Sequence, residues 1–146
     1  MPAKLGMHAK LYQNTGTYAS PVWSLMGNVK DVTLNLETGE ADVTTRGNAG
    51  WRATVATLRE ASVEFEMIWD PSDAGFTAIQ TAFFANSTVE LAVMDGDITT
   101  AGSQGLRATC MITSFSRAEA LEEAITASVT AKPTYAEHAP AWYVVP

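Results

Sequence analysis

Apolar and polar residues alternate with a period of two along most of this 146-residue chain, and that period is typical of extended strands. Turn-forming residues or a proline follow several of the alternating segments. A strand of this kind has one apolar and one polar face, so we predict a mainly β fold built on an antiparallel sheet. The apolar residues of the five predicted strands are Val32, Leu34 and Leu36; Ala61, Val63, Phe65, Met67 and Trp69; Val89, Leu91 and Val93; Leu106, Ala108, Cys110 and Ile112; and Ile125, Ala127, Val129 and Ala131.

One segment, between Asp70 and Asn86, has a helical pattern instead. Asp70 is a good cap, Pro71 suits the first helical position, and Asn86 suits the end of the last turn. We predict a single flanking α-helix over about residues 71–85 that covers the sheet. Three aromatic or aliphatic side chains at helical spacing share its apolar face: Phe76, Ile79 and Phe83.

The charge balance excludes one class of function. The chain has 9 Lys and Arg against 16 Asp and Glu, which gives a formal net charge of −7. The basic residues are scattered and form no stripe that would neutralise phosphates, so we expect no tight binding of nucleic acid. Charged residues make up 17% of the chain, below the usual value of about 25%. We therefore expect part of the surface to be covered by copies of the same chain.

Length and cysteine content limit the architecture further. A chain of 146 residues forms one domain and has enough core to fold without disulfides. Cys110 is the one cysteine, so neither an intrachain disulfide nor a four-thiolate zinc site can form. The first residues lack the apolar core of a secretory signal, and no apolar run approaches the length of a membrane span. We expect a protein made in the cytoplasm with no membrane partner.

The segment from Glu37 to Thr54 is the least regular part of the sequence. It is too long for a tight hairpin turn, and loops of this length in a compact domain are usually functional or disordered. It carries Arg46, Trp51 and Arg52, and these residue types are enriched at binding hot spots. Two interpretations stay open: a surface loop with Trp51 packed back onto the sheet, or an arm that reaches a neighbouring molecule.

Candidate catalytic and metal-binding residues are sparse. Glu64 and Glu66 lie two residues apart on one strand face, where they resemble the carboxylate pair of a glycosidase. Neighbouring carboxylates on an exposed strand are more often solvated, so we predict no catalytic residue and no enzymatic activity. His8 and His138 lie at opposite ends of the chain, so we predict no metal site and no cofactor. The alternative function is that of a small carbohydrate-binding or hydrolytic β-sandwich domain.

A series of short motifs, taken in order, resembles the phage tail tube proteins, the major tail proteins of long-tailed bacteriophages. The first three are DVTTR at residues 42–46, GWR at 50–52 and LREAS at 58–62. The later ones are LRATC at 106–110, SFS at 114–116 and EAIT at 123–126. The resemblance spans about residues 29–133, and the terminal extensions 1–20 and 135–146 have no predicted structure.

The resemblance implies a single tail-tube domain over residues 1–146, an antiparallel β-sandwich or half-barrel with one flanking helix. The type VI secretion tube protein is similar in fold. The resemblance to phage tail tube proteins also implies a structural subunit whose hexameric rings stack into the tail tube, the conduit for DNA during ejection. The implied partners are further copies of the chain, the tape-measure, terminator and baseplate proteins, and a sheath if the tail is contractile. The protein would be made in the host bacterial cytoplasm and would reside in the virion tail.

A tube that conducts DNA without binding it needs a lumen that repels phosphates. Carboxylates and hydroxyls do so at short range, within a Debye length of about 8 Å at physiological salt. We expect the 37–54 loop to contact the adjacent ring through Arg46, Trp51 and Arg52, and the polar faces of the two long strands to line the lumen. The alternative is that these faces only meet solvent. The expected lumen residues are Asp31, Thr33, Asn35, Ser62, Glu64 and Glu66.

Overall fold

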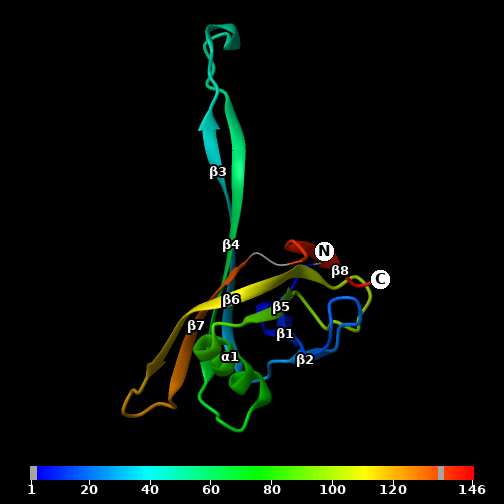
Figure 1. Ribbon diagram of the computed structural model, residues 1–146, viewed down its shortest axis with the longest axis vertical. Helices are drawn as coiled ribbons and strands as arrows, with labels where there is room; N and C mark the ends of the chain where they lie inside the picture. The colour runs from blue at the N-terminus through cyan, green and yellow to red at the C-terminus, as the bar shows by residue number, and fades with distance from the viewer. Residues whose placement is uncertain (1–2, 135–136) are drawn as a thin grey trace.

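Eight antiparallel strands form one curled sheet in a computed structural model that describes residues 3–134 and 137–146 (Figure 1). The strand order is β2-β1-β5-β6-β7-β4-β3, and β8 pairs with β6 outside this path. The sheet is not closed, so β2 and β3 are its two edge strands. The elements are β1 (Lys10–Asn14), β2 (Trp23–Leu25), β3 (Val29–Asp42), β4 (Thr54–Ile68), α1 (Ala74–Ala85), β5 (Thr88–Met94), β6 (Gln104–Ala118), β7 (Thr126–Pro133) and β8 (Ala141–Val144), with 3-10 turns η1 (Gly6–His8) and η2 (Arg46–Asn48).

The predicted fold class, a mainly β sandwich or half-barrel with one helix, is confirmed. Strand β6 holds the curled sheet together because it has three partners. One edge of β6 pairs with β5, while the other edge pairs first with β8, at residues 104–107, and then with β7, at residues 110–118. A register shift between Ile112 and Ser114 marks a bulge, and bulges bend and twist a strand.

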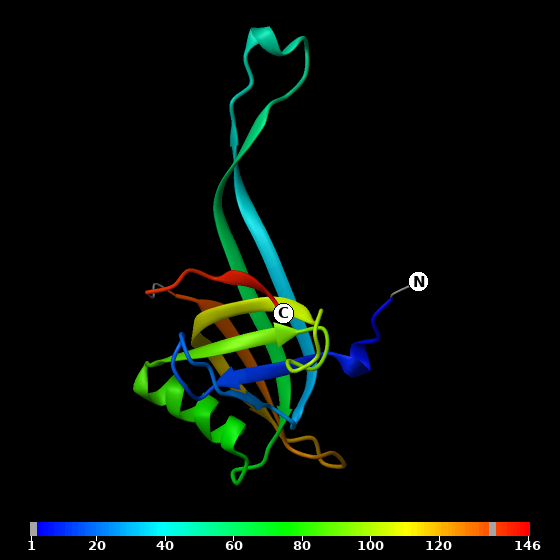
Figure 2. The same ribbon diagram turned by 90° about the vertical axis from the view of Figure 1, so that its right-hand side faces the viewer.

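The main core lies between the sheet and α1 (Figure 2). The predicted apolar faces of β4 and β7 point into it, because Val63, Phe65 and Met67 are buried opposite Ala131, Val129 and Ala127. From the helix, Phe76 and Ile79 are buried, and Phe83 is half-buried against the same core. The rings of Trp69 and Phe76 meet edge to face with 4.8 Å between centroids, an arrangement that stabilises aromatic pairs.

The helix begins later than the sequence predicted. Asp73, not Asp70, is its cap, and the Asp73 carboxylate accepts a hydrogen bond of 2.9 Å from the Phe76 amide. Asp70 instead closes a turn by accepting hydrogen bonds from the Ser72 hydroxyl and amide, which lower the pKa of its carboxyl. At the other end, Asn86 adopts the left-handed conformation of a C-cap (φ 51°), as predicted.

A smaller cluster covers the second face of the sheet, and both terminal segments contribute side chains to it. Tyr12, Ala92, Met94 and Val145 are buried there, with Trp23, Ile98 and Tyr143 packed around them. The segments left without predicted structure therefore contain two strands, β1 in residues 1–20 and β8 in residues 135–146, and β2 follows shortly after the first segment. In β1 the adjacent residues Leu11 and Tyr12 are both buried, which explains why this strand shows no alternation.

Arg107 is a charged side chain buried on this second face. Its guanidinium forms an ion pair with Glu90 and donates a hydrogen bond of 2.7 Å to the Tyr18 carbonyl oxygen. The guanidinium carbon also lies over the Tyr18 ring, 3.8 Å from its centroid. Asn14 donates a further hydrogen bond of 3.2 Å to the Glu90 carboxylate. The pair thus connects β5 and β6 to the 15–22 segment that crosses the face.

Truncating the apolar face of α1 should reveal how much the helix contributes to stability. Phe76→Ala is expected to lower the free energy of unfolding by about 3–5 kcal/mol, as large aromatic truncations in cores do. Phe84→Ala on the same helix is the control, because Phe84 is 74% exposed while Phe76 is 1% exposed. Chemical denaturation of both variants makes the comparison. An equal, small loss in both would mean that α1 contributes little to the core.

Candidate assembly surfaces

Strands β3 and β4 continue past the body of the protein as a two-stranded ribbon (Figures 1 and 2). They pair from Val29 opposite Met67 to Asp42 opposite Thr54, but β4 pairs with β7 only from Val63 onward. Residues 35–62 therefore form a projecting arm, and residues 43–53 are its tip. The predicted 37–54 loop is shorter than expected, because both strands extend into it and the turn joins them as a long hairpin.

Gly39 explains why the first strand was predicted to end early. The register shifts between Thr38 and Glu40, so the glycine lies at a β-bulge within the strand. A Cβ atom at this position would lie 2.5 Å from the Thr57 hydroxyl oxygen, so a larger residue would force the Thr57 side chain to shift. The glycine that looked like a turn signal thus permits a close cross-strand contact in the arm.

The arm tip is organised by its own hydrogen bonds. The Asp42 carboxylate accepts from the Thr44 hydroxyl and amide, which lower its pKa, and Thr45 and Asn48 form a reciprocal capping box around η2. Ala49 and Gly50 both have positive φ, and Trp51 follows them with 79% of its surface exposed. Trp51 therefore does not pack back onto the sheet.

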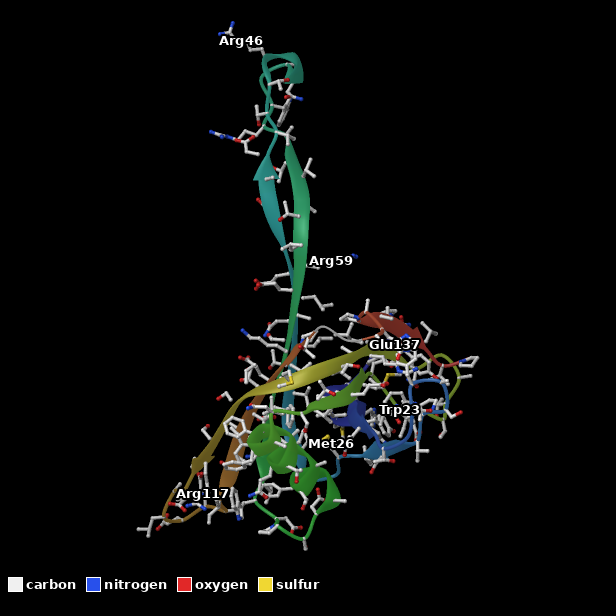
Figure 3. All side chains as sticks on the ribbon, viewed as in Figure 1. Trp23, Met26, Arg46, Arg59, Arg117 and Glu137 are labelled. Atoms are coloured by element: carbon white, nitrogen blue, oxygen red, sulfur yellow. The ribbon has the colours of Figure 1, made fainter. Side chains whose placement is uncertain are left out.

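The three residues expected to contact an adjacent ring all lie at this tip. Arg46 points outward from it (Figure 3), and Arg46, Trp51 and Arg52 are all exposed. Neither arginine takes part in an ion pair within residues 3–134 and 137–146. The tip thus presents an aromatic ring and two cations with no partner in the described part of the subunit.

Five of the six residues expected to line a lumen share one face of the sheet. Thr33 lies opposite Glu64, and Asn35 lies opposite Ser62. The Asn35 side-chain amide donates a hydrogen bond of 3.3 Å to the Ser62 hydroxyl oxygen. All six expected residues are exposed or half-buried, although Asp31 lies within a register shift and has no assigned opposite residue. Four further hydroxyl residues extend the same face across β7 and β6, which sequence reasoning did not include: Ser114, Ser116, Ser128 and Thr130.

Glu64→Gln/Glu66→Gln should leave the subunit folded and able to assemble. Neither carboxylate is buried or forms an ion pair with any described residue. Neutralising both carboxylates therefore leaves no cation without its partner. We expect the free energy of unfolding to stay within about 0.5 kcal/mol of wild type. Thermal unfolding and sedimentation check this. A variant that fails to fold would show that the carboxylates support the structure.

The described residues contain no group of three or more His, Cys, Asp or Glu side chains placed to hold a metal ion. Cys110 is buried, and burial raises the pKa of its thiol to about 12, far from that of a reactive thiolate. No helix among these residues is both long and apolar enough to cross a membrane.

Several solved structures share this fold. The tail of an empty GTA particle, refined with C6 symmetry, superposes with a TM-score of 0.74 at 18% identity over 99% of this chain and 100% of that one. The SPP1 tail tube gives 0.68 at 16% identity over 89% and 75%. The baseplate of the anti-feeding prophage gives 0.59 at 9% identity over 99% of both chains.

Sequence comparison identifies the family. No curated protein matches the chain closely enough to be a recognisable relative. A family profile described as phage tail tube protein matches residues 10–134. This range includes the helix, the arm and every strand of the sheet except β8. The chain belongs to the phage tail tube protein family.

Proposed function

We propose that the protein forms hexameric rings that stack into the phage tail tube, through which DNA passes during ejection. The observation that carries this proposal is the open sheet with a projecting arm. No strand among the described residues pairs with the outer edge of β3, which is 14 residues long, and such an edge is a template for pairing with another chain. A closed ring of copies removes free edges, and the arm gives the ring a contact beyond its own plane.

The polar sheet face suits the inner wall of such a ring. Its hydroxyls hydrogen-bond to water, and the carboxylates of Asp31, Glu64 and Glu66 repel phosphates over about one Debye length. Lys132 is the cation at the end of β7, so the face keeps an excess of negative charge. DNA would move along this wall without tight binding.

The position in the virion follows from the family. The protein is a structural component of the tail, made in the cytoplasm of the bacterial host before assembly. Its proposed partners beyond itself are the tape-measure protein inside the tube, the terminator and baseplate at its ends, and a sheath where the tail contracts. The carbohydrate-binding or hydrolytic alternative has no observation in its favour.

Negative-stain electron microscopy of the concentrated, purified protein tests the proposal. We expect rings or hollow tubes, whose length increases with protein concentration. Separate particles of subunit size at all concentrations would contradict self-assembly.

A further inference from the structure

A groove of about 340 Å³ lies at the open side of the sheet, between β3 and β1. Three of its lining residues, Val29, Leu34 and Val93, also pack against the main core, so the core opens to the surface here. Leu25 and Val32 line the same groove and are 49% and 36% exposed. Apolar surface that is exposed as a group indicates a site that another molecule covers.

The groove borders the outer edge of β3. The sheet order begins at β2 and ends at β3, and no strand among residues 3–134 and 137–146 joins these two edges. Figure 2 shows β3 and η1, which both contribute to the groove, on the right-hand side of the body. An unpaired strand edge and an opening to the core therefore lie side by side.

The C-terminal end of α1 has the complementary features. Phe84 lies in the last turn and is 74% exposed, although its ring meets the Phe83 ring edge to face at 5.3 Å between centroids. The last turn contains no Lys, Arg or His. The final carbonyl groups of a helix carry partial negative charge, which a cation stabilises. This helix end therefore presents an aromatic ring beside a negative dipole that has no cation in its own turn.

A second unpaired edge lies beside this helix end. Strand β5 pairs with β6 only as far as Thr88 opposite Met111. Residues 112–118 of β6 continue with β7 on one edge, and none of the described strands pairs with the other edge. Phe83 of α1 packs near Phe115 in this part of β6, with 6.1 Å between the ring centroids. The helix end thus accompanies one free edge, and the groove accompanies the other.

The two features lie on opposite sides of the subunit. In Figure 2, α1 ends on the left, where β5 begins, whereas β3 lies on the right. The helix end therefore meets the groove of a second copy rather than its own. A copy that aligns its free β6 edge with the β3 edge places its α1 at the groove, because both lie on the core face of the sheet.

Size and charge agree with a helix end as the occupant. A cavity of about 150 Å³ in a protein core already binds benzene, so the groove has room for the Phe84 ring. Lys30 also lines the groove, is exposed, and forms no ion pair with any described residue. Its ammonium can supply the cation that the last turn of α1 lacks.

We infer that the groove between β3 and β1 receives the C-terminal end of α1 from the neighbouring subunit of the same ring. Phe84 of one copy covers the open core of the next, and Lys30 of that next copy faces the helix end. Each subunit offers a helix end on one side and a groove on the other, and such a contact closes into a ring. The inference rests on the proposed function, because it needs neighbours within a ring.

Removing the aromatic ring tests the contact in the full-length protein. Phe84→Ala should raise the concentration needed for half-maximal tube formation by about 30-fold, as expected for loss of an anchor from an apolar groove. Thr77→Ala, at an exposed position earlier in the same helix, should leave that concentration unchanged. Circular dichroism checks that both variants are folded. Assembly of Phe84→Ala at the wild-type concentration would overturn the inference.

A charge exchange tests the role of Lys30. Lys30→Glu and Ala85→Lys should each raise the same concentration by about fivefold, because like charges then face each other across the contact. The double variant Lys30→Glu/Ala85→Lys should recover most of that loss. Lys132→Glu makes the same charge change on the polar sheet face, and combined with Ala85→Lys it should not restore assembly. Restoration by this control, or no recovery in the double variant, would overturn the pairing.

Disulfide trapping locates the contact directly. Subunits that carry Phe84→Cys alone are mixed with subunits that carry Val32→Cys alone, so a bridge within one chain is impossible, and Cys110 is buried in both. Oxidised mixed tubes should give linked pairs of subunits on a non-reducing gel, while tubes of either variant alone should not. Mixed tubes without linked pairs would overturn the groove assignment alone. Wild-type protein that forms no rings or tubes would remove the proposed function as well.

Discussion

Trp51→Ala is expected to abolish tube formation at the wild-type assembly concentration and to leave the subunit folded. Trp51 makes no core contact in the subunit, so its removal leaves no cavity. Loss of a central aromatic anchor typically weakens an interface by about 2 kcal/mol or more, which is about 30-fold for each contact. The contact recurs at every subunit of every ring, so the effect on a polymer is larger than on a dimer.

The control for this variant is Leu121→Ala. Leu121 is 100% exposed in the β6–β7 turn, at the end of the molecule away from the arm tip. Its removal changes exposed apolar surface without touching the arm. Circular dichroism and sedimentation on the same samples measure folding and assembly together. If Trp51→Ala unfolds the subunit, or still polymerises as wild type does, the arm tip has no role in stacking.

Arg107→Leu should give the largest loss of subunit stability among charge substitutions. It leaves the Glu90 carboxylate, whose side chain is 12% exposed, without its cation, and breaking one side of a largely buried ion pair typically lowers the free energy of unfolding by about 3–5 kcal/mol. The 15–22 segment also loses the guanidinium that holds the Tyr18 carbonyl and ring. Urea denaturation measures the change.

Arg117→Leu is the matched control. Arg117 pairs with Glu119 at 3.0 Å, but both side chains are about half exposed. Solvent screens such a pair, so we expect a loss below about 1 kcal/mol. Equal losses in the two variants would show that burial does not distinguish the two ion pairs.

The sequence predicted the strands whose two faces meet different surroundings. In β4, residues 61–67 alternate because one side packs on α1 and the other is polar, and that contrast is visible in the sequence. Residues 54–60 of the same strand are exposed on both sides, so their apolar and polar residues follow no period. The arm was therefore predicted as a loop, and Arg46, Trp51 and Arg52 of that loop lie at its tip.

A strand that is buried on both faces also lacks the alternating sequence pattern, so it is as difficult to predict as one that is exposed on both faces. Leu11 and Tyr12 are adjacent in β1 and both buried, Leu11 in the main core and Tyr12 in the second cluster. Such a pair does not alternate, and β1 is only five residues long. Strand β8 depends on pairing with β6, some 37 residues earlier in the chain. Contacts of that separation are absent from local patterns.

The helix start shows a competition between two local signals. Asp70-Pro71 is a good helix start, and so is Asp73 three residues later. Beginning at Ala74 with Asp73 as the cap still buries Phe76 and Ile79, while Asp70 and Ser72 form their own turn. Packing against the sheet requires only the apolar face of the helix. Asp70 is therefore not needed as the cap and forms the preceding turn instead.

Helical reconstruction by cryo-electron microscopy of the assembled wild-type protein tests the central claim most directly. The account predicts six subunits per ring, a hollow tube whose inner wall carries Thr33, Ser62, Glu64 and Glu66, and arms that cross from each ring to the next. Solid fibres, or a tube with the polar sheet face on its outer surface, would contradict it.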